Sequence, residues 1–535
     1  MATKRVRVEN VLAPAEYQKI DDFCAGRSGR DSLAAIAAFL AREFSTELKL
    51  DPDIVAGFLT DQSNLPGSAE AVAQPTDERQ CAAVLRACCR AGIPVTIAGG
   101  RSNLTGSATP QGGIVLSLAR LLTPEVRVDE SNLIVRAPAG MVLEEMRRKV
   151  LQQTEGRLFF PVDPTSRNDA AVGGAISCNA SGFTPGEPGA MRHWVESLEL
   201  LLVDGRKIKT RRGDHVSENG LFVLHDNGDE IRVPIPRYPR PAIKNAGGPF
   251  SAPDGRMDFV DLIVGSEGIL GVITACTLRL RRRPADYLDL FFSLPSERQA
   301  LALLEWLRRN LPGGVSSLSA LEYFGLNCRQ YMNHEERLFL GTNPVGIYIQ
   351  VPLDHDNLER AAEEWLHLLT SANCGVEEDS ILLLDNDRDR TIFFEARHSL
   401  PANSLEVVHR RGTYTIMTDT VVPPARFAEF LDFAHNLLRN QGLEYLAFGH
   451  FGDCHLHFNI LPDRRQIDLA VEAYDRIVEK STQLGGVYSG EHGTGKRKRK
   501  DFVKCYGSDA VEQVRRCKAA VDPLFLLNRG NVIEP

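Results

Sequence analysis

Paired cysteines, long apolar runs and an excess of basic charge are all missing from this 535-residue sequence. The eleven cysteines include no C-x-x-C pair and no iron–sulfur spacing, which excludes a disulfide framework and predicts reduced thiols. No stretch has the length and apolar character of a membrane span or a signal peptide. We therefore expect a cytoplasmic protein, with peripheral attachment to the inner membrane left open.

The charge balance is acidic, with 62 Lys and Arg against 70 Asp and Glu, and a formal net charge of -8. Nothing in this balance favours nucleic acid as a partner. The chain is too long for one compact core, so two or three domains are expected. It has no repeat at solenoid periods and no low-complexity linker.

The most informative residues lie in two short segments near the C-terminus. The first runs from Gly449 to Asn459 and contains His450, His455 and His457. The alternation from Cys454 to Asn459 predicts a strand that places the imidazoles of His455 and His457 on one face, and His450, before the Gly-Asp turn, can fold back toward them. Histidine ligands suit zinc, iron or manganese, and three protein ligands leave a position open for substrate. The alternative is a group of ordinary half-buried histidines at a strand edge.

The second segment, Gly490 to Lys496, places a Glu-His pair between glycines. The pair adds a candidate metal ligand, Glu491, and a separate titratable base, His492. The segment also matches the start of a phosphate-binding P-loop, but Arg497 follows where that motif needs Ser or Thr, which disfavours the nucleotide-hydrolase interpretation. The basic run 496–500 is typical of a solvated face.

Three glycine-rich stretches lie between residues 99 and 271. The first connects a predicted buried strand, Ile93–Ala98, to another predicted strand, Gly113–Leu118. A Rossmann fingerprint needs a helix after the glycine turn, so that fold is excluded. Glycines between two strands can still converge backbone N–H groups on a diphosphate, although a mobile surface loop is the alternative. The second stretch spans 161–182, and the third, 261–274, is predicted as strand, tight turn, strand. Together they indicate one extended cofactor that lies across several loops.

The rest of the pattern predicts mostly helices up to about Gly67 and an α+β arrangement after Pro284. The N-terminal helices are expected at Leu33–Leu40 and Pro52–Leu59. In the later region, strands alternate with amphipathic helices over one antiparallel sheet. The expected strands there are Tyr287–Phe292 and Gly346–Val351, and the expected helices are Glu297–Leu311, Asp356–Ser371 and Pro424–Gln441.

Taken together, these segments resemble the FAD-binding oxidoreductases of the vanillyl-alcohol oxidase type. The branch is that of flavin-type D-lactate dehydrogenase, the glycolate oxidase catalytic subunit and D-2-hydroxyglutarate dehydrogenase. The similarity runs from about Gly67 to Val532. It implies an α+β fold with an N-terminal helical cap (1–66), a PCMH-type FAD-binding domain of two α/β subdomains (67–284), an antiparallel-sheet substrate or cap domain (285–480) and a C-terminal helical segment that completes the flavin site (481–535).

The resemblance implies FAD as the cofactor, held by the glycine-rich stretches. Relatives with covalent flavin often use a histidine that would fall near Ser102, so a noncovalent cofactor is expected. The diphosphate would be cradled by Ala98, Gly99, Gly100, Arg101, Ser102, Asn103, Gly106 and Ser107. The isoalloxazine and ribityl side would be lined by Pro161, Gly173, Gly174, Ser177, Asn179 and Gly182, and the adenine side by Glu267, Gly268, Gly271 and Ile273. Asn528 belongs to a closing segment that would return to the flavin.

For the reaction, the resemblance implies oxidation of a D-2-hydroxy acid, with the Cα hydrogen leaving as hydride to flavin N5. The implied metal ligands for zinc, manganese or iron are His450, His457 and Glu491. The implied catalytic residues are His492 as base, Asn459 as a hydrogen-bonding neighbour of the substrate and Arg397 as the carboxylate clamp. A metal would lower the pKa of the hydroxyl, and an imidazole could accept its proton. The alternative for Arg397 is a surface arginine on a helix.

Two departures and two alternatives qualify this assignment. Cys454 and His455 stand where the family usually has a Gly-Asn pair. Met417 stands where D-2-hydroxyglutarate dehydrogenases have a lysine, which favours a D-lactate-like substrate.

One alternative is a transferase of the alkylglycerone-phosphate synthase type, although those relatives show His-His at Glu491-His492. The other is a flavin subunit of a larger redox complex. The expected partner is a separate electron acceptor, such as a quinone, a cytochrome, electron-transfer flavoprotein or an iron–sulfur protein, and a homodimer is left open.

Overall fold

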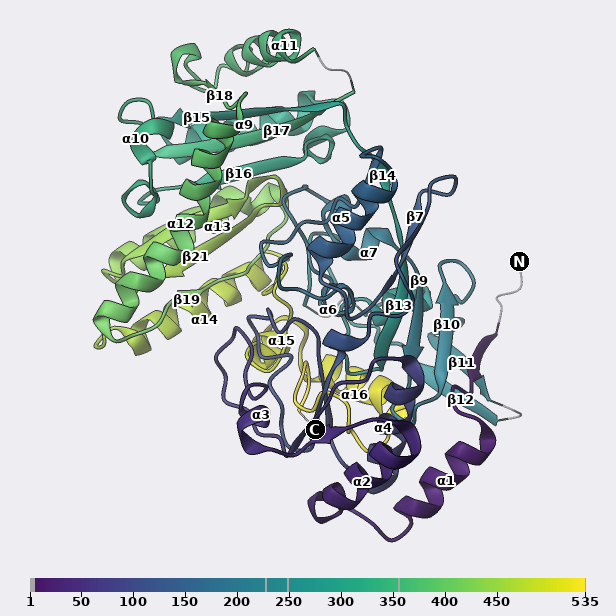
Figure 1. Ribbon diagram of the computed structural model, residues 1–535. Helices are drawn as coiled ribbons and strands as arrows, with labels where there is room; N and C mark the ends of the chain where they lie inside the picture. The colour runs from purple at the N-terminus through teal and green to yellow at the C-terminus, as the bar shows by residue number, and fades with distance from the viewer. Residues whose placement is uncertain (1–4, 227–228, 248–249, 355–356, 535) are drawn as a thin grey trace.

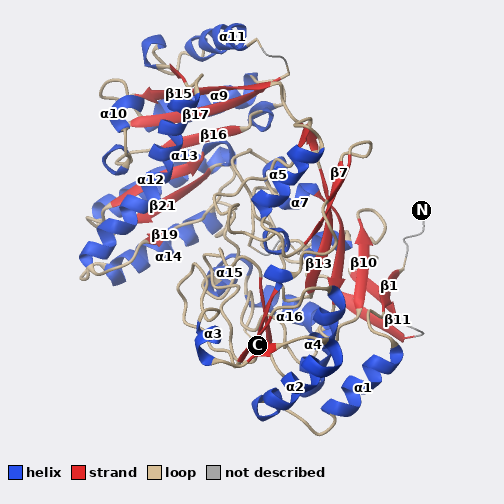
Figure 2. Ribbon diagram, in the orientation of Figure 1, coloured by secondary structure: helices blue, strands red, loops and turns tan. Residues whose placement is uncertain are grey.

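Three larger sheets, of four, eight and seven strands, organise the chain. The computed structural model describes residues 5–226, 229–247, 250–354 and 357–534. The seven-stranded sheet with its helices forms one lobe, at the upper left of Figure 1, and the two other sheets form the rest of the molecule. Helices cover the sheets on their faces, whereas much of the region between the lobes is loop (Figure 2).

The four-stranded sheet lies in the N-terminal part and has the order β2-β3-β5-β4. Helix α4 packs on this sheet because its alanine, leucine and cysteine side chains share one buried face. The helix begins where the Asp77 side chain accepts from the N–H of Gln80, and it ends at Gly92, which has a left-handed conformation. The parallel strands β4 and β5 are joined by a glycine loop without a helix, as predicted. The bounds are β2 Leu48–Lys49, β3 Ala71–Ala73, β4 Val95–Ala98, β5 Ile114–Ser117, α1 Pro14–Cys24, α2 Leu33–Phe44, α3 Pro52–Ala56 and α4 Glu78–Ala91.

The eight-stranded sheet has the order β12-β11-β1-β10-β9-β13-β7-β6. One of its inner strands comes from the N-terminus. This strand, β1, lies between β10 and β11 and pairs with both. The bounds are β1 Val6–Glu9, β6 Arg127–Asp129, β7 Ile134–Pro138, β9 Val195–Leu201, β10 Lys207–Arg211, β11 Leu221–Asp226, β12 Asp229–Pro234 and β13 Val272–Arg279, with helices α5 Leu143–Gln153, α6 Val172–Ser177, α7 Met191–Trp194 and α8 Phe259–Ile263 and the small pair β8 Leu158–Phe159 and β14 Arg281–Arg282.

The predicted strand before the third glycine turn is wrong, because this segment is the short helix α8. The Asp258 side chain accepts from the N–H of Val260 at 2.8 Å and caps the helix. A short apolar run such as Phe259–Ile263 does not distinguish a buried strand from a buried helical turn by its pattern alone. The turn and the following strand, β13, are present as predicted.

The seven-stranded sheet is antiparallel throughout its described pairs and has the order β18-β15-β17-β16-β20-β21-β19. Apolar side chains on one face, including Leu321, Tyr323 and Phe458, form a core with α9, α13 and α14. The predicted α+β arrangement is therefore confirmed. The bounds are β15 Asp286–Leu294, β16 Ala320–Phe324, β17 Val345–Leu353, β18 Leu382–Leu383, β19 Ile416–Met417, β20 Tyr445–His450, β21 His455–Ile460, α9 Glu297–Asn310, α10 Glu335–Leu338, α11 Leu358–Ser371, α12 Asp387–Arg411, α13 Phe427–Asn440 and α14 Ile467–Gln483. Asp356, where one predicted helix starts, lies outside the described residues.

The C-terminal segment returns to the four-stranded sheet after helices α15 (Arg499–Tyr506) and α16 (Ser508–Val521). The N–H of Val95 donates to the carbonyl of Leu526, and the N–H of Asn528 donates to the carbonyl of Val95, both at 2.9 Å. The basic run 496–500 is not simply a solvated face, because Lys498 is only 4% exposed and its ammonium is 2.8 Å from Asp419.

Within the described ranges, no helix combines the length and the apolar character that crossing a bilayer requires.

Candidate active site

A cavity of about 560 Å³ lies between the glycine-rich loops and the seven-stranded sheet. The ligand candidates His450, His457 and Glu491 and the candidates His492 and Arg397 all line it. The predicted cofactor residues that line it are Gly99, Gly100, Arg101, Ser102, Asn103, Ser107, Gly173, Gly174, Ser177, Gly182, Glu267, Gly268, Gly271, Ile273 and Asn528. The structure thus brings together, in one cavity, residues that are almost 430 positions apart in the sequence.

Four predicted cofactor residues are not among those that line the cavity: Ala98, Gly106, Pro161 and Asn179. The Asn179 side chain donates to the carbonyl of Asn245 at 3.3 Å and accepts from the N–H of Arg192 at 3.0 Å. It therefore holds the loops of the cavity wall together.

The floor of the cavity suits a cofactor that approaches the backbone closely. A Cβ atom added at Gly174, on α6, would meet no atom within 4 Å, so a side chain there would project into the open cavity. At Gly173, by contrast, an added Cβ would lie 2.7 Å from the Ala139 side chain. Gly173 permits close packing of the protein, and Gly174 keeps the cavity open for a flat group. The glycine loops therefore fit the FAD that the resemblance implies.

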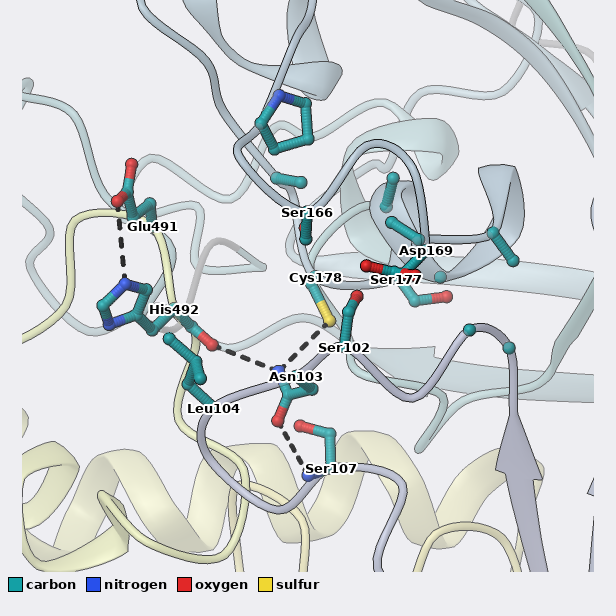
Figure 3. Close-up of a pocket in the computed structure, with 18 of the residues that line it drawn as sticks. Ser102, Asn103, Leu104, Ser107, Ser166, Asp169, Ser177, Cys178, Glu491 and His492 are labelled. Atoms are coloured by element: carbon teal, nitrogen blue, oxygen red, sulfur yellow. Dashed lines mark hydrogen bonds and ion pairs between the residues drawn. The ribbon is translucent and has the colours of Figure 1, made fainter. Parts of the chain in front are cut away.

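Asn103 connects the first glycine loop to the second C-terminal segment (Figure 3). Its Oδ1 accepts from the backbone N–H groups of Thr105 at 2.9 Å and Ser107 at 3.0 Å, and its Nδ2 donates to the carbonyl of His492 at 3.3 Å. The loop that would carry the diphosphate is thereby fixed to the residue that would act as base.

Two imidazoles and one carboxylate converge on one point of the cavity wall. His450 Nε2 is 3.1 Å from Glu491 Oε2, and His457 Nε2 is 3.2 Å from Glu491 Oε1. A tetrahedral ion about 2.0–2.1 Å from each ligand would hold its ligand atoms about 3.3 Å apart. The observed separations fit such an ion, and the imidazole and carboxylate donors suit zinc, manganese or iron.

Hydrogen bonds on the opposite side of each ring orient these two histidines. His450 Nδ1 is 2.8 Å from Glu322 Oε1, and His457 Nδ1 is 3.1 Å from the carbonyl of Thr418. Both rings therefore direct Nε2 toward Glu491, which is the arrangement of metal-binding histidines supported by an oxygen acceptor. Lys244 adds a positive charge, because its ammonium is 3.4 Å from both Glu491 and Asp453.

The charges of this cluster shift its pKa values strongly. Burial alone lowers the pKa of His450, but Glu322 and Glu491 outweigh it and raise this pKa to about 9. Burial alone raises the pKa of Glu491, but His450 and Lys244 outweigh it and hold it well below its ordinary value. Without a metal, the cluster is therefore an ion-paired group with a carboxylate at its centre.

The loop that carries Glu491 and His492 is held from two sides. Asp419, which is fully buried, accepts from the backbone N–H groups of Glu491 at 3.2 Å and His492 at 3.1 Å. On the other side, Glu267 accepts from the backbone N–H groups of Thr494 and Gly495, both at 2.7 Å. One carboxylate belongs to the lobe of the seven-stranded sheet and the other to the third glycine turn, so the loop has a fixed position between them.

His492 lies with its ring nearly parallel to that of His457, with ring centroids 5.3 Å apart. Its Nδ1 is 3.6 Å from Asp419 and its Nε2 is 3.6 Å from Glu491 Oε1. Burial lowers the pKa of His492 to about 4, although Asp419 opposes this shift. The ring is therefore neutral at pH 7 and has a free position for a proton.

Arg397 is buried in α12, not on a helix surface. It is 5% exposed, its Nη2 is 3.2 Å from Glu322 Oε2, and its guanidinium lies 5.1 Å from the ring centre of Phe183. Within the described residues its Nε has no hydrogen-bond partner. Because Arg397 also lines the cavity, its guanidinium can receive a carboxylate there.

Asn459, His455 and Cys454 differ from the other candidates. Asn459 is buried, and its Oδ1 has no partner in the described part of the chain, but it does not line the cavity. His455 is fully buried with Nε2 2.9 Å from Asp419, and one of its ring nitrogens belongs to a group of ligand atoms within 4.8 Å of one another that also includes the three ligand candidates. Cys454 adopts a left-handed conformation with φ of 55°, and its sulfur is 2.9 Å from Arg308.

Three charged residues that complete the site, Glu322, Asp419 and Lys244, were not among the sequence candidates. Glu322 interrupts the apolar strand Ala320–Phe324, and Asp419 follows Met417 at the end of β19. A charged residue within an apolar strand is seldom buried without a partner. That signal is present in the sequence for Glu322, although it does not identify the partner.

Comparison with known proteins places two family matches on the chain. The family described as "FAD binding domain" matches residues 69–211, and the family described as "FAD linked oxidases, C-terminal domain" matches residues 291–532. The matched regions include the first two glycine stretches and both histidine-containing segments.

Individual relatives agree with these matches. The chain is similar to a D-lactate dehydrogenase of Archaeoglobus fulgidus, with 27% identity over 88% of this chain and 93% of the relative. It is also similar to the mitochondrial D-2-hydroxyglutarate dehydrogenase of Danio rerio, with 26% identity over 89% and 81%. A structure of p-cresol methylhydroxylase with substrate bound matches 98% of this chain and 99% of its own, with a TM-score of 0.66 and 14% identity. The last match confirms the predicted PCMH-type FAD-binding fold.

Proposed function

This chain belongs to the FAD-linked oxidoreductases, and on that premise we propose that it oxidises a D-lactate-like D-2-hydroxy acid to the 2-oxo acid. The observation that supports the proposal most directly is the meeting of His450, His457 and Glu491 with His492 on the wall of the cavity that the glycine loops line. The names of the relatives, a D-lactate dehydrogenase and a D-2-hydroxyglutarate dehydrogenase, support the substrate class.

The cofactor in this proposal is noncovalent FAD. The first glycine loop and the third glycine turn would hold it, and Gly174 leaves the space that a flat ring needs. The first loop offers Ser102 where a covalent attachment would use a histidine. When bound, FAD supplies the acceptor for the hydride that leaves the substrate Cα.

The ligand set in this proposal consists of His450 Nε2, His457 Nε2 and one or both carboxylate oxygens of Glu491. A divalent ion there, zinc, manganese or iron, supplies the positive charge that lowers the pKa of a substrate hydroxyl. The protein residues keep the position accessible because all three ligand residues border the cavity. The charge of Lys244, 3.4 Å from Glu491, would oppose the ion and moderate its affinity.

The remaining residues orient the substrate and accept its proton. Arg397 would bind the substrate carboxylate, because it lines the cavity and its guanidinium can donate to a carboxylate there. His492 would accept the hydroxyl proton at Nε2, because Nδ1 faces Asp419. Phe183 and Phe448 lie against the guanidinium of Arg397, and Met417 is a further apolar residue of the cavity wall. These side chains exclude water and suit a substrate with a small or apolar side chain.

The electrons would pass to a separate acceptor, a quinone, a cytochrome, electron-transfer flavoprotein or an iron–sulfur protein. The cysteines in the described residues are all free, and their spacing offers no cluster motif. The proposal therefore places the acceptor outside this chain, on a small molecule or on another protein.

The experiment is anaerobic titration of the purified flavoprotein with a panel of D- and L-2-hydroxy acids, followed in the visible flavin spectrum. We expect bleaching by a D-acid of the lactate class, and no bleaching after chelation or in the variant His492→Ala. Bleaching that is unchanged by a chelator would contradict the ligand set. Bleaching by an L-acid only would contradict the substrate class, and the absence of bleaching with every acid would leave the transferase or the subunit of a redox complex as the better proposal.

A further inference from the structure

Glu322 is a buried carboxylate in the middle of an apolar strand. Its side chain is 2% exposed in β16, between Leu321 and Tyr323. Placing a carboxylate there is costly unless charged partners compensate for the lost hydration. The identity of those partners therefore indicates what the residue does.

Its two oxygens contact two different parts of the candidate active site. Oε1 is 2.8 Å from His450 Nδ1, and Oε2 is 3.2 Å from Arg397 Nη2. The first contact follows from strand register, because Glu322 and His450 are opposite each other in the β16–β20 pair. The second contact reaches across to helix α12. One side chain therefore connects a ligand histidine to the carboxylate clamp.

The contact with His450 determines which ring nitrogen faces the cavity. With Nδ1 directed at Glu322, Nε2 is directed at Glu491, 3.1 Å away. Once His450 has lost one of its two ring protons, an acceptor at Nδ1 favours the tautomer that keeps the other proton there and leaves a free lone pair at Nε2. Glu322 therefore prepares His450 as an Nε2 ligand.

The contact with Arg397 fixes one end of the guanidinium. Nη2 donates to Glu322 Oε2 at 3.2 Å, and Arg397 also lines the cavity. The rings of Phe183 and Phe448 lie 5.1 and 5.8 Å from the guanidinium carbon and restrict its plane. The guanidinium is thus held in one orientation beside the cavity.

We infer, on the basis of the proposed function, that Glu322 is a positioning residue that fixes the metal-ligand histidine and the carboxylate-binding arginine relative to each other. A 2-hydroxy acid has its hydroxyl and carboxylate on adjacent carbons, so its two anchoring groups must keep a constant separation. A single rigid carboxylate between them provides that separation. The simpler alternative is that Glu322 only neutralises buried Arg397, in which case its removal would not affect metal binding.

The variant Glu322→Gln tests this inference because glutamine preserves the shape but has only one acceptor oxygen. It can satisfy either His450 or Arg397, and its amide hydrogens then face the other donor. The matched control is Glu297→Gln, since Glu297 also pairs with a buried histidine, His435, at 2.9 Å and accepts from Tyr323 at 2.6 Å. Both His435 and Tyr323 belong to the other side of the sheet, away from the cavity.

The first measurement is calorimetric titration of the chelator-treated flavoprotein with Mn²⁺, which does not depend on activity. We expect Glu322→Gln to weaken Mn²⁺ binding by about 10–100-fold and Glu297→Gln to change it by less than about twofold. The second measurement is the steady-state KM for D-lactate at saturating Mn²⁺, which we expect to rise at least about tenfold in Glu322→Gln alone. In the double variant with Arg397→Met, the two effects on KM should be less than multiplicative.

Wild-type Mn²⁺ affinity and wild-type KM in Glu322→Gln would overturn the inference, as would a change in KM without a change in Mn²⁺ affinity. If no 2-hydroxy acid reduces the wild-type flavin, the proposed function fails, but the Mn²⁺ titration still decides whether Glu322 positions His450. If Glu322→Gln does not fold, Glu322→Asp replaces it, since aspartate keeps the charge but withdraws it by one bond of about 1.5 Å. Wild-type Mn²⁺ affinity in that variant would also overturn the inference.

Discussion

Asp419 offers the most demanding test of how the active-site loop is held. Its carboxylate is fully buried and accepts from His455 at 2.9 Å, Ser489 at 2.6 Å and Lys498 at 2.8 Å. It also accepts from the two backbone N–H groups of the Glu491-His492 pair. Although burial opposes ionisation, His492 and Lys498 outweigh it and hold the pKa of Asp419 well below its ordinary value. The carboxylate therefore stabilises the fold at every pH above its unfolded pKa, and this contribution is lost only as the pH falls through the folded pKa.

The substitution Asp419→Asn replaces one acceptor oxygen with an amide donor. Whichever way the amide is turned, its NH2 group faces at least one N–H or O–H donor. The ammonium of Lys498, which is 4% exposed, also loses its charged partner. Breaking a buried pair in this way costs about 3–5 kcal/mol. We therefore expect Asp419→Asn to lower the free energy of unfolding by about 3–5 kcal/mol and to impair metal binding at Glu491.

The assay is urea unfolding of the metal-free flavoprotein at pH 7, followed by circular dichroism. Its control is the double variant with Lys498→Met, which removes the uncompensated charge. We expect the double variant to recover about 1–3 kcal/mol relative to the sum of the two single effects. A loss below about 1 kcal/mol in Asp419→Asn, or strictly additive effects in the double variant, would refute this account of the network.

Three further predictions concern the cavity itself. Gly174→Leu should leave the thermal stability of the apoprotein unchanged or slightly higher, since leucine favours helix. It should weaken FAD binding at least about 100-fold in a fluorescence titration, because the leucine side chain enters the cavity. Wild-type affinity would contradict the role of Gly174 in keeping the cavity open for FAD. Mn²⁺ affinity should rise about tenfold from pH 7 to 8 and less steeply from 8 to 9, since His450, with a pKa near 9, must lose its proton to bind the ion. A flat profile in calorimetry would contradict that requirement. Met417→Lys should raise kcat/KM for D-2-hydroxyglutarate relative to D-lactate by about tenfold or more, because the added ammonium can pair at the cavity wall with the second carboxylate of the substrate. An unchanged ratio would contradict the placement of Met417 in the substrate site.

Much of the fold could be predicted from local pattern. Apolar periodicity, capping residues and glycine turns predict the strands on either side of the first glycine loop, the helices α2 and α9 and the seven-stranded antiparallel sheet. The one wrong element, the strand predicted before the third glycine turn, is a run of five residues in which helix and strand patterns coincide. The N-terminal strand β1 has no local signal for its place, since its neighbours β10 and β11 lie about 200 residues further along the chain.

The candidate site could be predicted only in part, and from the spacing of residues rather than from apolar periodicity. His450, His457, Glu491 and His492 belong to segments with a recognisable spacing, and the structure places all four at one cavity. Glu322 and Asp419 belong to no such spacing, and each interacts with those segments through contacts made only in three dimensions. A polar residue in an apolar strand indicates that a partner exists, but the partner depends on strand register.

Local sequence was enough to identify the groups available for chemistry, which are the imidazoles and the glycines without side chains, and to disfavour competing cysteine or P-loop motifs. Those properties depend on residue type and short spacing, which the chain carries whatever its conformation. The three-dimensional packing was needed to show that Nε2 of both ligand histidines faces Glu491 and that buried Arg397 lines the cavity and donates to Glu322. Ring orientation and burial depend on which distant segments pack together, and the pairing of β16 with β20 is set by the whole sheet and its core rather than by either strand alone.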